Sequence, residues 1–223
     1  MPSPGQRGGS PRFFTSHQAA VVEDATARIA PGPGDDPAEA GHPGAREAGV
    51  TGYIDIMLGA LGALDGDDPP PAIFAGGPRG SRHSSGPDLP LMGSFVRLDP
   101  VARIAWRDRL AGWRREYTRG IAALDAMAGG DFTSASPGEQ DKILARREVS
   151  AFTSLLFEHT IEGMYANPEY GGNRGLAGWE DIRFPGDAQP RGYSGEEVER
   201  SDGHDPAPDT PIVADVLKLL GAI

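Results

Sequence analysis

The sequence predicts an all-α protein, a small irregular bundle of about four to five helices with long Pro/Gly-rich loops and extended arms. Three observations lead to this prediction. Apolar residues recur at helical spacing in several segments, and no segment shows the strict alternation that is typical of a strand. Capping residues, glycines and prolines delimit these segments. The 223 residues include 32 Gly and 21 Pro, which favour long turns and loops.

Composition excludes several classes of function. The formal net charge is −11 and no block of basic residues occurs, so nucleic-acid binding is disfavoured. The absence of cysteine excludes disulfides, zinc thiolate sites and iron–sulfur clusters. The longest apolar stretch, Ile56–Leu64, is too short to span a membrane, which needs about 20 residues. Leu, Ile, Val and Phe make up only about a fifth of the chain, so the core is expected to be modest.

We divide the chain into three parts. Residues 1–12 form a disordered or extended N-terminal tail, because they are rich in Pro, Gly and Ser. Residues 13–193 form the helical domain, which includes a long loop at 66–98. Residues 194–223 form a C-terminal arm with one short helix that begins at about Asp209.

The first helix of the domain begins at Thr15 or Ser16, either of which can cap it. The preceding Phe13-Phe14 pair is expected to act as a hydrophobic staple over the first turn. The helix ends at 31–44, where Pro, Gly and Asp predict turns. Its apolar face consists of Val21, Val22, Ala25 and Ile29.

A second helix is predicted from Arg46 to Gly66, with the clearest apolar face in the chain. Three glycines inside it weaken it by up to about 1 kcal/mol each relative to alanine, so it needs packing to persist. These glycines would also admit a close neighbour; they are Gly52, Gly59 and Gly62. The apolar face consists of Val50, Tyr53, Ile54, Met57, Leu58, Leu61 and Leu64.

The longest helix is predicted to open at Asp99-Pro100 and to end at Gly129-Gly130. A fourth helix opens with the capping box Ser136-Pro137-Gly138-Glu139 and ends before Pro168, and the chain beyond it is predicted to be irregular to about Pro208. The face of the longest helix consists of Trp106, Leu110, Trp113, Tyr117, Ile121 and Leu124. Its aromatic members are either core residues or anchors for a partner.

A metal-like cluster occurs in the fourth helix at Glu158, His159 and Glu162. A di-metal site in a bundle needs several carboxylates and Glu-x-x-His units from different helices, whereas here there is one cluster in reversed order. A polar stripe, with His159 bonded to a neighbouring carboxylate or carbonyl, is therefore favoured. The alternative is an independent metalloprotein or enzyme that uses these three residues.

The segment at 165–186 combines aromatic residues with glycines and prolines. Its glycines permit unusual backbone geometry, its prolines fix direction, and its aromatic rings are costly to leave in water. It is therefore predicted to be a clasp, laid either over the helices of its own chain or over a partner. The partner-binding candidates are Tyr165, Tyr170, Gly171, Gly172, Asn173, Trp179 and Phe184.

Several stretches in the same order resemble the gluconate 2-dehydrogenase subunit 3 family. The resemblance covers most of residues 13–193, with a break at 66–98. Its most specific part is the run from Glu162 to Gly186. The matching stretches are Phe13-Phe14-Thr15, Pro43 to Val50, Tyr53-Ile54-Asp55, Tyr117 to Leu124, Glu162-Gly163-Met164-Tyr165, Asn167-Pro168, Tyr170-Gly171-Gly172-Asn173, Gly178-Trp179 and Pro185-Gly186.

The resemblance implies that this chain is the small subunit of an FAD-dependent dehydrogenase or oxidase acting on a sugar or glycoside. The partner would be a glucose-methanol-choline type flavoprotein that holds FAD, and the chain itself would contribute no catalytic, cofactor-binding or metal-binding residue. Members of this family support the folding, stability or export of the large subunit. A self-standing helical scaffold with another partner is a further alternative.

The N-terminus departs from a pattern found in many members, which carry a twin-arginine export signal. The stretch MPSPGQRGGSPRFF has neither paired arginines nor an apolar segment of the kind found in secretory signals. The sequence therefore leads us to expect a cytoplasmic complex, or a periplasmic one if the partner carries the export signal.

Overall fold

The structure, a computed structural model, describes residues 13–65 and 100–184. Every regular element in these two ranges is helical, which confirms the all-α prediction. The α-helices are α1 (Ser16–Ile29), α2 (Ala45–Ala48), α3 (Val50–Gly59), α4 (Pro100–Met127), α5 (Pro137–Leu144), α6 (Ser150–Tyr165) and α7 (Ala177–Asp181). Short 3-10 helices are η1 (Pro37–Glu39), η2 (Ala60–Asp65), η4 (Phe132–Ser134), η5 (Arg147–Val149), η6 (Pro168–Tyr170) and η7 (Arg174–Leu176).

Three predicted segments lie outside the described residues: the tail 1–12, the long loop 66–98 and the C-terminal arm 194–223 with its short helix. The described helices number more than the four to five expected, because two of the predicted helices are each divided and α7 forms in a segment predicted to be irregular. None of the described helices combines the length and the apolar character that crossing a membrane requires.

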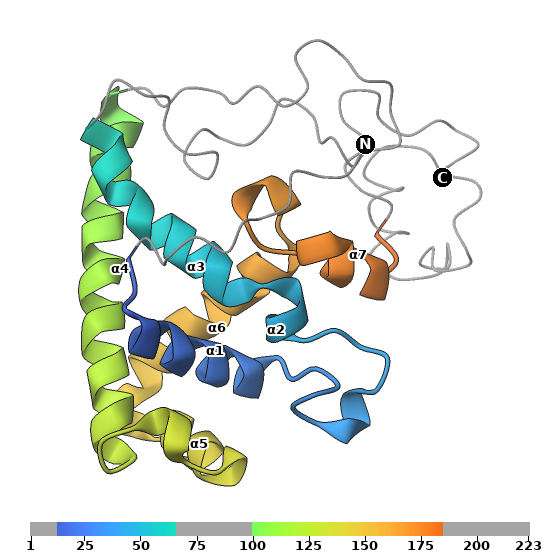
Figure 1. Cartoon of the computed structure of the whole chain (residues 1–223). Coiled ribbons are helices and arrows are strands. Elements are labelled where there is room, and N and C mark those ends of the chain that lie inside the picture. Colours follow the sequence, from blue (N-terminus) through green and yellow to red (C-terminus); the bar gives the residue numbers. More distant parts are fainter. Residues whose placement is uncertain (1–12, 66–99, 185–223) are drawn as a thin grey trace, which may run out of the picture.

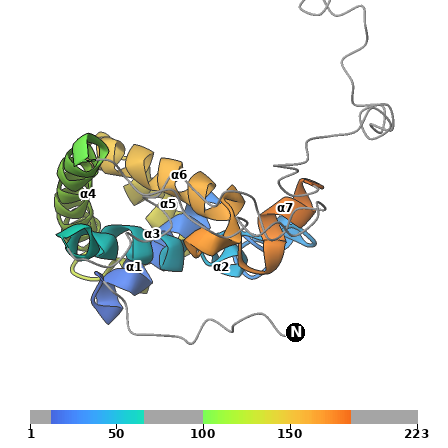
Figure 2. The same ribbon diagram turned by 90° about the horizontal axis from the view of Figure 1, so that it is seen from above.

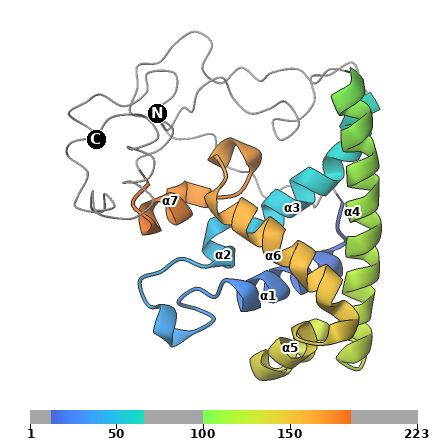
Figure 3. The ribbon, with the colours of Figure 1, turned by 180° about the vertical axis from the view of Figure 1, so that it is seen from behind.

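Helix α4 runs along one edge of the molecule, and the other helices extend from one side of it (Figure 1). Seen from above, α6 lies on one side and α1 and α3 on the other (Figure 2). Seen from behind, α6 crosses α1 and α3, against which it packs (Figure 3). The core between these helices includes Val21, Val22, Ile54, Leu58, Leu110, Tyr117, Leu124, Phe152 and Leu156.

The start of α1 follows the prediction closely. Thr15 caps it, and the side chain of Gln18 returns to the Thr15 N–H to complete a capping box. The ring of Phe14 lies 5.7 Å from the ring of Tyr117, so it anchors the start of α1 on α4. The side chain of Asp55 on α3 accepts hydrogen bonds from the backbone N–H groups of Phe13 and Phe14, at 2.8 and 2.9 Å.

Asp55 is 8% exposed, and its replacement is expected to be costly. Asp55→Ala would leave two backbone N–H groups without this acceptor, which should lower the free energy of unfolding by about 2 to 3 kcal/mol. Urea unfolding followed by circular dichroism measures this change. Asp108→Ala is the control, because Asp108 is exposed on α4 and should tolerate the same change. Equal stability of the two variants would contradict the assigned role of Asp55.

The predicted second helix is not continuous. Gly49 adopts a left-handed conformation, with φ of 71°, and ends α2 before α3 begins at Val50. Its N–H donates to the carbonyls of Ala45 and Arg46, so glycine serves here as the C-cap of α2. A continuous helix from Arg46 to Gly66 was therefore a wrong prediction, although the predicted apolar face is buried in α3.

Among the described residues, two of the glycines expected to admit a close neighbour, Gly52 and Gly62, have none. A Cβ atom at Gly52 would lie 3.9 Å from the Gly171 carbonyl oxygen, an ordinary van der Waals distance, and one at Gly62 would meet nothing within 4 Å. The close approach occurs at Gly120 on α4, where a Cβ atom would overlap the ring of Phe152 on α6. Gly120 therefore lets α6 pack directly against the backbone of α4.

The predicted fourth helix is also divided. Its capping box forms as expected between Ser136 and Glu139, but α5 ends at Leu144 and α6 begins at Ser150. Arg146, between the two helices, has extended backbone angles. The break leaves the Leu144 carbonyl without a partner within the helix, and the hydroxyl of Thr153 donates a hydrogen bond to it at 3.0 Å. The break lets the two helices bury separate faces, so tertiary packing overrides local helix propensity here.

Candidate functional site

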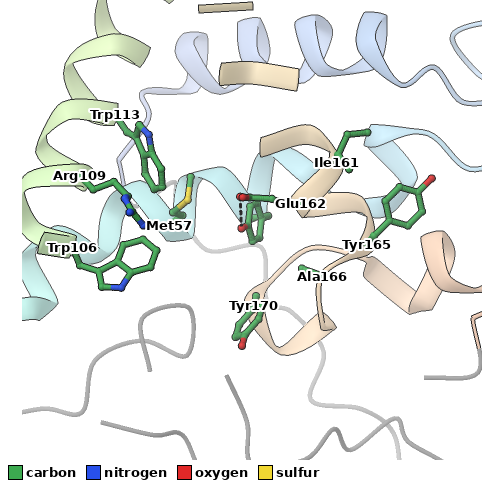
Figure 4. A pocket seen from close by; sticks show the side chains of 10 residues that line it. Met57, Trp106, Arg109, Trp113, Ile161, Glu162, Tyr165, Ala166 and Tyr170 are labelled. Carbon is green, nitrogen blue, oxygen red and sulfur yellow. Dashed lines mark hydrogen bonds between the residues drawn. The ribbon is translucent and has the colours of Figure 1, made fainter. Parts of the chain in front are cut away.

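An open groove with a volume of about 550 Å³ lies between α3, α4, the C-terminal half of α6 and the turn η6. Figure 4 shows the side chains of Trp106, Arg109 and Trp113 reaching in from α4, opposite Glu162 of α6. The remaining lining residues are Tyr53, Met57, Ile161, Tyr165, Ala166 and Tyr170. Most of the lining is aromatic or aliphatic, so the groove is suited to an apolar group with a few directed polar contacts.

The polar pair in the groove is Tyr53 and Glu162. The Tyr53 hydroxyl donates a hydrogen bond to Oε2 of Glu162 at 3.0 Å (Figure 4). Partial burial in the groove raises the pKa of the Glu162 carboxyl, and the hydrogen bond from Tyr53 and the charge of Arg109 act in the opposite direction. Burial, and then the nearby Glu162 carboxylate, raise the pKa of the Tyr53 phenol. Tyr53 therefore stays protonated and holds the carboxylate in place.

Arg109 faces this pair from α4. Its Cζ atom lies 4.8 Å from the ring centre of Trp106 and 5.8 Å from that of Trp113, both within range of a cation–π interaction. The two indole rings meet edge to face, with centres 6.1 Å apart. Within residues 13–65 and 100–184, no carboxylate lies within ion-pair distance of Arg109. Its guanidinium is therefore positioned by aromatic rings and keeps its donors available.

The segment that follows α6 is more regular than predicted. Instead of continuing irregularly toward Pro208, the described part forms η6, η7 and α7. Asn173 holds it to the end of α6: its backbone N–H donates to the Gly163 carbonyl at 2.7 Å, and its Nδ2 donates to the Ala166 carbonyl at 3.1 Å. Its Oδ1 accepts from the N–H of Gly178 at 2.9 Å. Because Asn173 is fully buried, these bonds form in a protected site.

Trp179 closes the same segment onto α6. Its ring is 4% exposed, its Nε1 donates to the Tyr165 carbonyl at 2.8 Å, and it meets the ring of Phe184 edge to face at 5.0 Å. The backbone of α6 leaves no space for a side chain at Gly172 or Gly178, as a Cβ atom there would overlap the carbonyl of Gly163 or Met164. The segment is therefore a clasp over the helices of its own chain.

The predicted partner-binding residues fall into two groups. The buried group consists of Gly171, Gly172, Asn173 and Trp179, which serve the internal clasp. The more accessible group consists of Tyr165 and Tyr170, which line the groove, and Phe184, which is 39% exposed. Contact of these residues with a partner stays a prediction.

The side chains of the alternative metal cluster, Glu158, His159 and Glu162, do not converge on one point. Successive helix positions differ by about 100° in direction, so His159 points into the core while Glu158 and Glu162 are exposed. Nδ1 of His159 pairs with the Tyr117 hydroxyl at 2.9 Å, rather than with the carboxylate or carbonyl that was predicted, and the two rings are stacked. Among the described residues, these three side chains do not form a group that could hold a metal ion. Burial lowers the pKa of His159 to about 4, so it is neutral at pH 7.

A different group of possible ligands consists of His17, Asp125 and Asp131, whose ligand atoms lie within 4.8 Å of one another. These atoms already have structural partners. Nε2 of His17 bonds Oδ2 of Asp125 at 2.9 Å, and Oδ1 of Asp125 accepts from the N–H of Phe132 at 3.0 Å. Asp131 caps η4 through the backbone N–H and hydroxyl of Thr133. The group therefore joins the start of α1 to the end of α4.

Sequence reasoning placed Trp106 and Trp113 on one helical face but missed Arg109. The signal was the spacing, because Arg109 follows Trp106 by three positions and precedes Trp113 by four. Residues three and four apart are neighbours on a helix surface, and arginine over tryptophan is a favourable pair. The combination with Tyr53 and Glu162 depends on how α3, α4 and α6 pack, and no local pattern encodes it.

Comparison with known proteins gives one match. The family model of gluconate 2-dehydrogenase subunit 3 matches residues 16–186, which includes every described helix and the groove. No curated protein and no solved structure matches the chain. The matched range covers most of the 223 residues, and this chain therefore belongs to the gluconate 2-dehydrogenase subunit 3 family.

Proposed function

We propose that this chain is a non-catalytic accessory subunit that binds and stabilises an FAD-dependent catalytic subunit of the glucose-methanol-choline type. The substrate of the complex would be a sugar or glycoside, oxidised at a CH–OH group by the flavin of the partner. The observation that carries this proposal is the family match, since the family is that of a subunit and so implies a hetero-oligomeric partner.

The groove is a structural feature that supports this proposal. A soluble protein rarely exposes a large contiguous apolar surface without a use for it. Trp and Tyr are enriched where proteins bind one another, because each buries a large area at a low cost in conformational entropy. Tyr165 and Tyr170 line the groove together with Trp106, so part of the predicted partner-binding segment contributes to this surface.

Co-expression tests the proposal. A candidate FAD-dependent dehydrogenase is produced with this chain, with an empty vector, and with the Gly178→Ala variant, whose fold should be impaired. Soluble yield, flavin content per polypeptide and dehydrogenase activity are measured. We expect all three to rise with the wild-type chain only, because a partner that binds the folded state stabilises it by mass action. Equal values with wild type and empty vector would eliminate the proposed function for that pair.

A further inference from the structure

We propose that the groove between α3, α4 and α6 receives a protein segment of the catalytic subunit that places an apolar side chain against Trp106 and a carboxylate against Arg109. This inference rests on the proposed function and adds the surface and the chemistry of the contact.

The shape of the groove indicates a protein segment as the occupant. Its volume of about 550 Å³ is sufficient for one or two large side chains, and it is open along one side. Large apolar side chains are also exposed on α6, which borders the groove. Ile161 lines the groove and is 39% exposed, and Phe157, one helical turn before it, is 54% exposed. An apolar surface that continues beyond the hollow fits a polypeptide better than a small molecule.

Charge indicates what that segment carries. Helix α4 contains six arginines and only three carboxylates, although the whole chain has a formal net charge of −11. Arg109 is the arginine that faces the groove, and it lies across two indole rings. A planar guanidinium that is held in place loses little freedom when it binds a carboxylate with two parallel hydrogen bonds. The α4 wall therefore fits an Asp or Glu of the partner.

The α6 wall of the groove determines which way round the partner segment binds. Glu162 is held by Tyr53 and presents a carboxylate on the α6 side. An acidic side chain of the partner would be repelled there and attracted at Arg109, so the charged end of the segment should lie toward α4. A second copy of this chain is disfavoured as the occupant, because two molecules that each carry a net charge of −11 repel one another at long range.

The experiment measures the dissociation constant of the complex between the purified full-length chain and the FAD subunit by biolayer interferometry. Two groove variants are compared, Arg109→Glu and Trp106→Ala. The matched control is Arg119→Glu, which makes the same charge reversal on α4 at a side chain that is 75% exposed and outside the groove. Thermal unfolding of each variant checks that the fold persists. We expect Arg109→Glu and Trp106→Ala to weaken binding at least tenfold, and Arg119→Glu to change it less than twofold.

The outcomes separate this inference from the proposed function. If the wild-type chain binds no FAD subunit, the proposed function fails and the inference with it. If the wild type binds and both groove variants bind within twofold of Arg119→Glu, the groove assignment is overturned while the proposed function stands. If size-exclusion chromatography with light scattering shows a homodimer that Arg109→Glu dissociates, the groove belongs to a second copy and the assignment to the catalytic subunit is also overturned.

Discussion

Gly178→Ala is expected to detach the clasp from α6 and to lower the free energy of unfolding by about 3 kcal/mol, at the upper end of the usual cost of overpacking. A Cβ atom at this position would overlap the carbonyl oxygen of Met164 and press on the ring of Tyr165. The main obstacle is backbone, which cannot rotate away as a flexible side chain can. If the clasp moved away to relieve this overlap, the hydrogen bond from the Gly178 N–H to Oδ1 of Asn173 would break.

Two measurements report this effect. Urea unfolding gives the change in free energy, and the fluorescence of Trp179 should shift to longer wavelength, because its ring is 4% exposed and would gain contact with water. The background from the other two tryptophans, Trp106 and Trp113, should change little, since they lie on α4.

Gly112→Ala is the matched control. This glycine lies inside α4, and a Cβ atom there would approach only the end of the Arg115 side chain, at 3.9 Å. The same substitution should therefore stabilise the protein by about 0.5 to 1 kcal/mol, as expected for alanine in place of glycine within a helix. If both glycine variants shift stability in the same direction, the close packing of the clasp on α6 is refuted.

The sequence was sufficient for features that depend on a few neighbouring residues. An N-cap at Thr15 or Ser16, the capping box at Ser136 and the end of α4 near Gly129-Gly130 were predicted, because capping chemistry is local. The apolar faces of α3 and α4 were predicted from helical periodicity, and most of their members are buried.

Prediction from neighbouring residues was wrong about the continuity of two helices. The break at Gly49 had a local signal, since glycine in a left-handed conformation is a common helix C-cap. The break between Leu144 and Ser150 had none, because the residues there are compatible with a helix and the break depends on long-range packing. Among the contacts that join α5 to the rest of the molecule is a two-bond ion pair between Arg28 on α1 and Asp141 on α5, at 2.7 and 3.0 Å.

Several of the stretches that resemble the family lie where one helix or segment packs on another. Asp55 bonds to the backbone of the Phe13-Phe14 pair, and Gly120 admits the ring of Phe152. Asn173 and Gly178 hold the clasp to α6. These residues therefore support the fold of the subunit. Four groove residues, Tyr53, Glu162, Tyr165 and Tyr170, also lie in the matching stretches, whereas Arg109 does not. The resemblance therefore includes part of the groove wall from α3, α6 and η6, and none of the groove residues from α4.

The stability of the fold is expected to decrease between pH 6.5 and pH 4 because of His159. Its ring is 1% exposed, and burial lowers its pKa to about 4, from an ordinary value of about 6.5 in an unfolded chain. Between these two pH values the unfolded chain binds a proton at His159 and the folded chain does not. The neutral, buried His159 therefore makes its full contribution to the free energy of unfolding above pH 6.5. About 3 kcal/mol of that free energy is lost by pH 4.

Urea unfolding at intervals from pH 7.5 to pH 4 measures this loss. Carboxylates also titrate in this range, so the result is read as the difference between the wild type and His159→Asn. Asparagine cannot take up the proton and can still accept the hydrogen bond of the Tyr117 hydroxyl, so the variant should be less stable at pH 7 but should lose less stability on acidification.

His17→Asn supplies a control of opposite sign. The hydrogen bond to Asp125, followed by the charge of that carboxylate, raises the pKa of His17, so its contribution is present below pH 6.5 and is lost as the pH rises through the folded pKa. Replacing His17 should thus leave the loss of stability in acid in place. If His159→Asn shows the same acid dependence as the wild type, His159 is not held neutral in the core, and the packing of α6 against Tyr117 must be revised.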